Sequence, residues 1–260
     1  GAQIWSRGYK YVFGFYSQAP TYSHGGLEIA KQKGYKSLAL VNEDTAFPQD
    51  VVKGAEAKAK ELGMELVFKE TYPAKTTDFS VLVQKMKGRN PDIVVGGTYL
   101  PDSTSIIRQA KDAGFTAKMF FFTTGPALPE FAENLGPLAE NVMGNTEWEP
   151  VVKAPGVPEF VKAFKEKYGN EPGYHAAGAY ASGQVLEAAV QKAGGLDREK
   201  LRDAFATLKI DTVFGPYQVD AEGRQIGKPN FVIQWQGGKR VVVWPKQYAN
   251  AEAKLPFTWK

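Results

Sequence analysis

A short apolar run that ends in two glycines, followed by a polar and aromatic loop, is the part of the sequence best suited to binding a small molecule. The run is Val94–Gly97, and Thr98, Tyr99 and Asp102 follow it. Ligands of open α/β sheets bind in the crevice outside the carboxyl ends of the strands. We therefore expect Thr98 and Tyr99 to contact a ligand by hydrogen bonding and stacking, with an exposed loop tip as the alternative.

Catalytic chemistry has little support in the sequence. The two histidines, His24 and His175, lie far apart. No His-Glu-x-x-His, Gly-x-Ser-x-Gly or Gly-x-Gly-x-x-Gly motif occurs. Gly223–Lys228 is similar to a phosphate-binding loop but is one residue short, Pro229 replaces its serine or threonine, and its surroundings predict a hairpin turn. We expect no enzymatic activity, no cofactor and no metal site.

The elements that must position the loop alternate regularly between strands and helices. Apolar runs predict strands over 37–41, 65–68, 92–95, 118–122 and 142–147, and helical spacing predicts helices over 51–62, 79–86, 106–113 and 129–135. A strand over 9–15 and a helix over 21–33 are predicted ahead of them. Such alternation is typical of βαβ units and a parallel sheet, so the fold class is α/β.

The alternation stops at Trp148. Residues 149–158 contain three prolines and are typical of a linker. Three helices are predicted next, over 159–168, 174–193 and 198–208, and the middle one is small and apolar nearly all round, which predicts burial on most sides. Strands are predicted over 213–219, 230–235 and 240–244, the last two joined by a hairpin at Gly237-Gly238.

Composition narrows the classes of protein further. The 260 residues are 43% hydrophobic, enough for one large domain or two small ones. Cysteine is absent, which excludes disulfides, zinc–thiolate sites and cysteine nucleophiles. The net charge of +4 is spread thinly, so nucleic acid is not an expected partner. No apolar stretch approaches the roughly 18 residues of a membrane span.

Several short stretches carry a resemblance to one known family. They are Leu40–Phe47, Thr76–Ser80, Asn90–Asp92, Gly96-Gly97, Arg108–Ala110, Lys167–Gly169 and Gly215–Arg224. Taken together, they resemble the periplasmic solute-binding proteins of ABC importers, in the branch of the leucine/isoleucine/valine-binding proteins, and their order and spacing agree with that family over nearly all of the chain. The resemblance implies a type I periplasmic-binding-protein fold, in which two α/β lobes are joined by three crossings and hold the ligand between them.

The resemblance also implies a domain division. Residues 1–147 and 227–260 would form the second, C-terminal lobe, and residues 148–226 the helical part of the first lobe. Members of the family carry a further segment ahead of the position of Gly1, and that segment builds the sheet of the first lobe. We therefore expect a missing N-terminal segment, or a second chain, to complete the first lobe and to cover the middle helix.

Further ligand contacts follow from the resemblance. Phe47 matches a position, often aromatic, that stacks on the ligand, and a core aromatic under the next helix is the alternative. The loop of Thr98 and Tyr99 supplies an aromatic contact in the family but is one residue longer here, which leaves open which side chain faces the ligand. Tyr16, at the first crossing, and Trp148, at the second, are expected either to line the cleft or to pack in the hinge.

Thr124 stands where amino-acid binders often place an acid that pairs with the ammonium group of the ligand. A buried ammonium without a carboxylate partner is costly. Thr124 therefore favours an aromatic, aliphatic or 2-oxo carboxylate. Asp102, Glu43 and Glu147 are alternative sources of the negative charge, so branched-chain and other amino acids stay open as ligands.

The function implied by the resemblance is capture of a small carboxylate or amino acid by hinge closure and its delivery to an ABC transporter permease. The expected location is the periplasm, or a lipid-anchored extracytoplasmic position in a Gram-positive source. Residues 1–5 do not read as a signal peptide. A ligand-sensing domain of a receptor or regulator is the alternative, less favoured because no DNA-binding helix-turn-helix or membrane span is attached.

Overall fold

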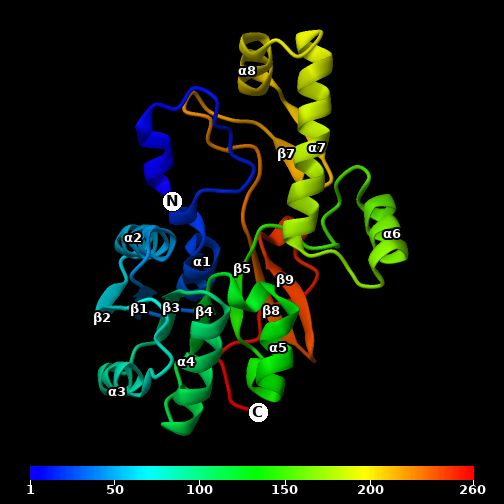
Figure 1. Ribbon diagram of the computed structural model, residues 1–260. Helices are drawn as coiled ribbons and strands as arrows, with labels where there is room; N and C mark the ends of the chain where they lie inside the picture. Colours follow the sequence, from blue (N-terminus) through cyan, green and yellow to red (C-terminus); the bar gives the residue numbers. More distant parts are fainter. The chain divides into compact units, whose positions relative to one another are not determined.

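The computed structural model describes residues 1–260 and groups them into two compact units (Figure 1). Unit 1 comprises Gly1, Ala19–Thr146 and Phe231–Lys260, and unit 2 comprises Ala2–Gln18 and Glu147–Asn230. Beyond Gly1, the chain therefore passes between the units after residues 18, 146 and 230. The sequence placed the last two boundaries after residues 147 and 226. The assignment of these units to the second and first lobes of the family stays a prediction.

One seven-stranded sheet forms the centre of unit 1. Its strands are β1 (Ser37–Glu43), β2 (Glu65–Tyr72), β3 (Ile93–Gly97), β4 (Met119–Phe122), β5 (Met143–Thr146), β8 (Phe231–Gln236) and β9 (Lys239–Trp244). Their order is β2-β1-β3-β4-β5-β8-β9. The first five are parallel, and β8 and β9 add an antiparallel hairpin at one edge. The predicted parallel α/β sheet is confirmed.

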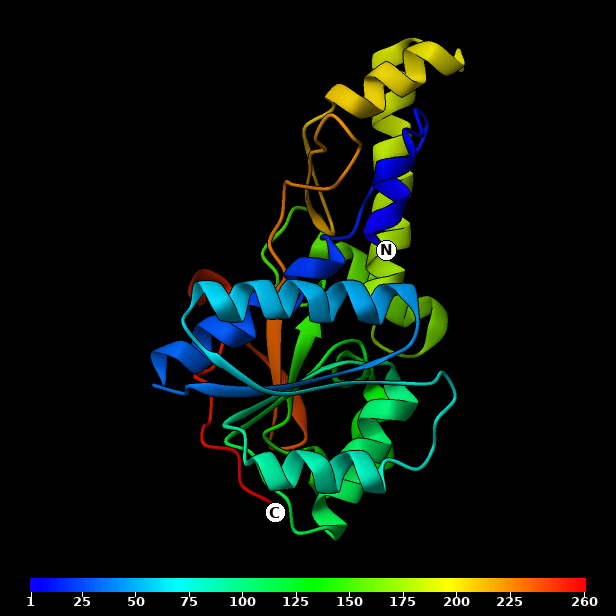
Figure 2. The ribbon, with the colours of Figure 1, turned by 90° about the vertical axis from the view of Figure 1, so that its left-hand side faces the viewer.

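Helices cover both faces of this sheet. In Figure 2, α1 (His24–Gln32) and α2 (Ala46–Glu61) lie on one face, and α3 (Ser80–Arg89) and α4 (Leu100–Asp112) lie on the other. Continuous apolar strands are needed because both faces are buried. Phe121 packs in the same buried cluster as residues of α1 and α2. Phe120 and Phe122, one residue to either side, stack on each other at 6.3 Å on the opposite face.

Helix α2 packs unusually closely on the short helix η2 (Ala19–Thr21), and Gly54 permits this. A Cβ atom at Gly54 would lie 1.9 Å from the carbonyl oxygen of Pro20. No side chain fits at that distance, so any larger residue would force α2 away from η2. The helix that follows β1 is thereby fixed in position, together with the residues at its N-terminus.

Unit 2 is mainly helical. It contains η1 (Ala2–Arg7), α6 (Val157–Tyr168), α7 (Tyr174–Ala193), α8 (Arg198–Thr207) and a two-stranded antiparallel sheet of β6 (Ile210–Thr212) and β7 (Gly215–Tyr217). A small core joins Val185 of α7 to Tyr217 of β7, with Phe13, Phe15 and further residues packed against it. The three helices predicted over 159–208 are confirmed with small shifts at their ends.

One prediction about unit 2 is wrong, and another stays a prediction. Residues 9–15 form no strand; they run as an irregular segment in which the Gly14 amide donates to the Gly223 carbonyl at 2.8 Å. Their alternating pattern reflects Phe13 and Phe15 packing on one side only. Helix α7 is buried along one face, while Tyr180 and Leu186 are 53% and 50% exposed. The expectation that a further segment or a second chain covers the exposed side of α7 stays a prediction.

The remaining α-helix is α5 (Pro129–Leu135), which follows β4 as predicted. None of the helices combines the length and the apolar character that crossing a bilayer would require.

The close approach of α2 and η2 predicts a large effect of one methyl group. Replacing Gly54 with alanine should lower the free energy of unfolding by about 1–3 kcal/mol, because the Cβ overlaps backbone atoms that cannot rotate away. Gly88→Ala in α3 is the control, since nothing lies within 4 Å of its Cβ. It should be neutral or stabilising by about 0.5–1 kcal/mol. Urea denaturation of the two variants measures the difference, and equal stabilities would contradict it.

Candidate functional site

The carboxyl-end edge of β3 lies against the start of α2. A Cβ atom at Gly97 would lie 2.5 Å from the carbonyl oxygen of Pro48, the residue after Phe47. Glycine at this strand end therefore lets the backbone of β3 meet the first turn of α2. The two aromatic residues that begin the following helices, Phe47 and Tyr99, are brought together as a result. Their ring centroids lie 6.0 Å apart at an interplanar angle of 33°.

Tyr22 extends this aromatic pair to a group of three. Its ring meets that of Phe47 edge to face, with centroids 5.4 Å apart and an interplanar angle of 75°. Tyr22 comes just before α1, and sequence analysis did not single it out because no strand precedes it directly. Edge-to-face packing of this kind is a favourable arrangement of two aromatic rings. The aromatic group of Tyr22, Phe47 and Tyr99 is the main feature of this edge.

Of the two candidate side chains in the loop after β3, Thr98 and Tyr99, only one is accessible. Thr98 is fully buried, and its amide donates to the Thr123 hydroxyl at 3.0 Å. The hydroxyl of Thr98 lies 3.4 Å from the Thr123 carbonyl oxygen, so the two threonines join the ends of β3 and β4. Tyr99 is 36% exposed. Of the two, Tyr99 is the side chain available to a ligand, and Thr98 positions the loop.

Thr124 sits in a strained turn at the end of β4. Its φ and ψ are 62° and −62°, and the Gly125 amide donates to the Thr123 carbonyl at 2.7 Å. This is a γ-turn of the rare form with positive φ, which costs a residue with a side chain about 1–3 kcal/mol. Strain of this kind concentrates at functional sites. The half-buried Thr124 therefore stays a candidate contact.

Asp102 is a helix-capping residue. It is 3% exposed, and one carboxylate oxygen accepts hydrogen bonds from the Tyr99 amide and the Tyr72 hydroxyl, both at 3.1 Å. Burial raises the pKa of Asp102, and these two donors act in the opposite direction. Burial, and then the charge of Asp102, raises the pKa of Tyr72. Both partners come from unit 1 itself, which favours a structural role for Asp102 over a ligand contact.

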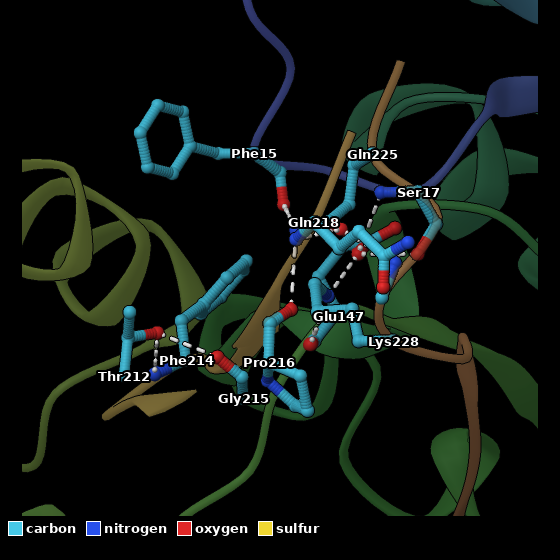
Figure 3. A network of polar contacts seen from close by, with 11 residues as sticks. Phe15, Ser17, Glu147, Thr212, Phe214, Gly215, Pro216, Gln218, Gln225 and Lys228 are labelled. Carbon is cyan, nitrogen blue, oxygen red and sulfur yellow. Dashed lines mark hydrogen bonds and ion pairs between the residues drawn. The ribbon is translucent and has the colours of Figure 1, made fainter. Parts of the chain in front are cut away.

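The other acids that were considered as charge sources also have partners in the chain. Glu43 is 8% exposed and accepts a hydrogen bond from the Thr45 hydroxyl at 2.9 Å. Glu147 is 1% exposed and pairs with Lys228 in unit 2 (Figure 3). Each acid therefore has a donor within the chain, but Oε1 of Glu147 is buried without a hydrogen-bond partner, so Glu147 stays an alternative source of the negative charge.

Tyr16 and Trp148 both lie in unit 2 and pack there. The Tyr16 ring makes edge-to-face contacts with Tyr174 and Phe214, with centroids 6.2 and 5.3 Å away. Burial, and to a smaller degree the charge of Glu147, raises the pKa of Tyr16. Trp148 is 1% exposed, and its indole N–H donates to the Val213 carbonyl at 2.8 Å. These contacts favour packing in the hinge over lining a cleft.

Comparison with known proteins gives a consistent result. A family model for periplasmic binding proteins matches residues 2–239. Leu/Ile/Val-binding protein homolog 7 of Brucella suis biovar 1 is 28% identical over 239 residues, which are 88% of this chain and 60% of that protein. Homolog 8 of Brucella abortus is 26% identical over 242 residues, 87% of this chain and 59% of that protein. The chain thus spans about 60% of the length of these relatives.

Solved structures share the fold. A leucine binding protein from Thermotoga maritima aligns with a TM-score of 0.84 at 26% identity, over 93% of this chain and 69% of that one. A solute binding protein of an ABC transporter from R. palustris, solved in complex with benzoate, aligns with a TM-score of 0.80 at 20% identity, over 94% and 68%. The predicted fold class is confirmed by these alignments.

The capping role of Asp102 can be tested by stability alone. Asp102→Ala leaves the partly buried Tyr99 amide and the buried Tyr72 hydroxyl without their acceptor, so the free energy of unfolding should fall by about 1–3 kcal/mol. Asp112→Ala, at the exposed C-terminal end of the same helix, is the matched control and should change little. Chemical denaturation monitored by circular dichroism measures both. If the Asp102→Ala variant were as stable as the control, the proposed structural role of Asp102 would be contradicted.

Proposed function

We propose that this chain, which belongs to the periplasmic binding protein family, captures a small carboxylate outside the cytoplasmic membrane and holds it against the aromatic group of unit 1. The family consists of solute-binding proteins and not of enzymes. The proposed mechanism is hinge closure, in which the ligand shifts the population of conformations toward a closed state because it binds that state better.

The pair of Phe47 and Tyr99 is the observation that supports this proposal most directly. Both rings lie at the carboxyl-end edge of a parallel sheet, where ligands of such sheets bind. Tyr99 is partly exposed and carries a hydroxyl group, so it offers a flat apolar face together with one polar handle. Binding sites for small molecules combine apolar and aromatic walls with a few fixed polar groups.

The charges at the edge favour a ligand that lacks an ammonium group. Thr124, which follows β4, carries no carboxylate. Asp102 and Glu43 accept hydrogen bonds from donors of their own unit. An ammonium group buried here would lose its hydration without gaining an ionic partner. An aromatic, aliphatic or 2-oxo carboxylate is therefore the proposed ligand class. A branched-chain amino acid is the alternative, supported by the names of the Brucella relatives.

The partners follow from the same proposal. The loaded protein would deliver its ligand to an ABC transporter permease from the periplasm or an equivalent extracytoplasmic position. A further segment or a second chain would complete the first lobe and supply the groups that bind the ligand carboxylate. A ligand-sensing domain of a receptor or regulator is the second candidate, since it can share this fold.

The ligand class can be tested on the full-length protein that contains this chain. Native mass spectrometry of freshly purified material should show a bound small carboxylate. Thermal unfolding with benzoate, 4-methyl-2-oxopentanoate and leucine as separate probes should show a higher Tm with at least one of the two amine-free acids. Stabilisation by leucine alone would contradict the proposed class, and conversion of any probe to a product would contradict a binding protein.

The contribution of Tyr99 can be measured by truncation. Tyr99→Ala in the full-length protein removes a stacking contact worth about 0.5–1.5 kcal/mol beyond its buried area, so the Kd of the stabilising acid should rise roughly tenfold. Tyr9→Ala is the control because Tyr9 is also an exposed tyrosine and lies in unit 2. Isothermal titration calorimetry gives both constants. Equal affinities of the two variants would exclude Tyr99 from the site.

The role of Thr124 can be tested by introducing an acidic side chain at this position. Thr124→Glu should weaken binding of the amine-free acid and strengthen binding of leucine, because the new carboxylate repels the first ligand and pairs with the ammonium group of the second. Thr124→Gln has nearly the same shape without the charge and is the matched control. The ratio of the two Kd values should shift by roughly tenfold or more relative to the glutamine variant. An unchanged ratio would show that Thr124 does not face the ligand.

A further inference from the structure

Three residues of unit 2 lie close in sequence to the three places where the chain passes between the units. Ser17 lies just ahead of Ala19, the first residue of a long unit 1 segment. Glu147 directly follows Thr146, and Lys228 lies just ahead of Phe231, where the chain returns to unit 1. Each residue therefore belongs to a different one of the three connections.

One carboxylate joins all three residues (Figure 3). The Lys228 ammonium donates to Oε2 of Glu147 at 2.5 Å and to the Glu147 carbonyl at 2.9 Å. Ser17 donates to the same Oε2 through its amide at 3.2 Å and its hydroxyl at 3.1 Å. The side chains of Glu147 and Lys228 are 1% and 2% exposed, so solvent does not weaken the pair.

The ammonium group of Lys228 has a third support from Phe214. It lies 4.2 Å from the centroid of the Phe214 ring. The turn that presents this ring is fixed by Thr212, whose hydroxyl donates to the Gly215 carbonyl at 2.7 Å and accepts from the Phe214 amide at 3.1 Å. Burial lowers the pKa of Lys228, and the Glu147 carboxylate opposes that shift.

Gln225 makes a second tie between the first and third connections. Its side-chain amide nitrogen lies 3.5 Å from the Phe15 carbonyl and 3.3 Å from the Pro216 carbonyl. Its side-chain oxygen accepts from the Gly227 amide at 2.7 Å and from the Gln218 amide at 3.3 Å. Gln225 thereby holds the segment before Ser17 beside the segment before Lys228.

A buried ion pair of this kind is not explained by stability. Replacing both partners of such a pair with residues that carry no charge is often neutral or stabilising, whereas removing one partner is strongly destabilising. What the pair supplies is a single geometry, because each donor must point at one oxygen atom. Here that geometry involves all three connections at once.

We propose that Glu147 and Lys228 are positioning residues of the hinge, which hold the three connections together as one rigid body on the side of unit 2. Movement between the units is then confined to the residues on the side of unit 1, and the three connections cannot loosen independently. The inference rests on the proposed hinge closure. The pair acts by limiting the number of open conformations, which raises the fraction that is competent to bind.

The proposal can be tested on the full-length protein that contains this chain, by double electron–electron resonance between two spin labels. The chain has no cysteine, so Gln84→Cys in α3 and Gln191→Cys in α7, both exposed, give one spin label on each unit; any cysteine outside this chain is replaced first. The double variant Glu147→Gln with Lys228→Met removes the ion pair without leaving one charge buried. Without any ligand, its distance distribution should be roughly twofold broader than that of the parent protein.

The matched control is Glu56→Gln with Lys69→Met, which removes an exposed ion pair of unit 1 with side chains 43% and 44% exposed. Its distribution should keep the parental width. A hinge variant that unfolds cooperatively but keeps the parental width would overturn the proposal. If the double variant does not fold, Ser17→Ala removes the hydroxyl bond to Glu147 and leaves the amide bond and the ion pair intact. It should broaden the distribution less, and no broadening would also overturn the proposal.

The outcome of the distance measurement does not depend on which ligand the protein binds. Distances are recorded without ligand, so they report on the connections even when none of the probe acids binds. Absence of binding by benzoate, 4-methyl-2-oxopentanoate and leucine to the parent protein would count against the proposed function. Parental width in the hinge variant would count against the hinge role alone.

Discussion

Parallel pairing of β1, β3 and β4 is the constraint on which the rest of unit 1 depends. Gly96 lies opposite Val41 on one side and Phe122 on the other, so the three strands end at the same edge of the sheet. Each loop that leaves this edge must start a helix that packs back along the sheet. The residues at the starts of those helices, Phe47 and Tyr99, are therefore brought together although they are distant in sequence. The position of the candidate site therefore follows from the strand register, and the side chains determine only its chemistry.

The same constraint explains how much of the fold could be predicted. Strands buried on both faces need continuous apolar runs, which are easily seen in a sequence, and all seven strands of the large sheet were found. Residues 9–15 also alternate, but an extended segment that packs Phe13 and Phe15 on one side produces the same pattern as a strand. Helix α7 was expected to be buried nearly all round. Its alanines permit burial, but composition cannot say what covers Tyr180 and Leu186.

At the candidate site, position after a strand was a sufficient guide to Phe47 and Tyr99, whereas their roles in binding stay predictions. Sequence alone could not separate Thr98 from Tyr99, because that distinction depends on a hydrogen bond to Thr123 in the next strand-end loop. Partners that are distant in the sequence account for the residues that were missed. Lys228 finds Glu147 across 81 positions, and no local pattern encodes that contact.

The placement of buried acids connects the proposed ligand class with the proposed hinge. In unit 1, Asp102 is engaged by Tyr72 and by the backbone, so the edge next to Tyr99 presents aromatic and neutral groups. In unit 2, Oε2 of Glu147 accepts from Lys228 and Ser17, and the proposed role of this carboxylate is to hold the connections together. Separating either carboxylate from its donors would break a buried hydrogen-bond network, which is costly. The proposed preference for ligands without an ammonium group and the proposed hinge role of Glu147 therefore rest on the same kind of observation, because in both units the chain supplies donors to its own buried acids.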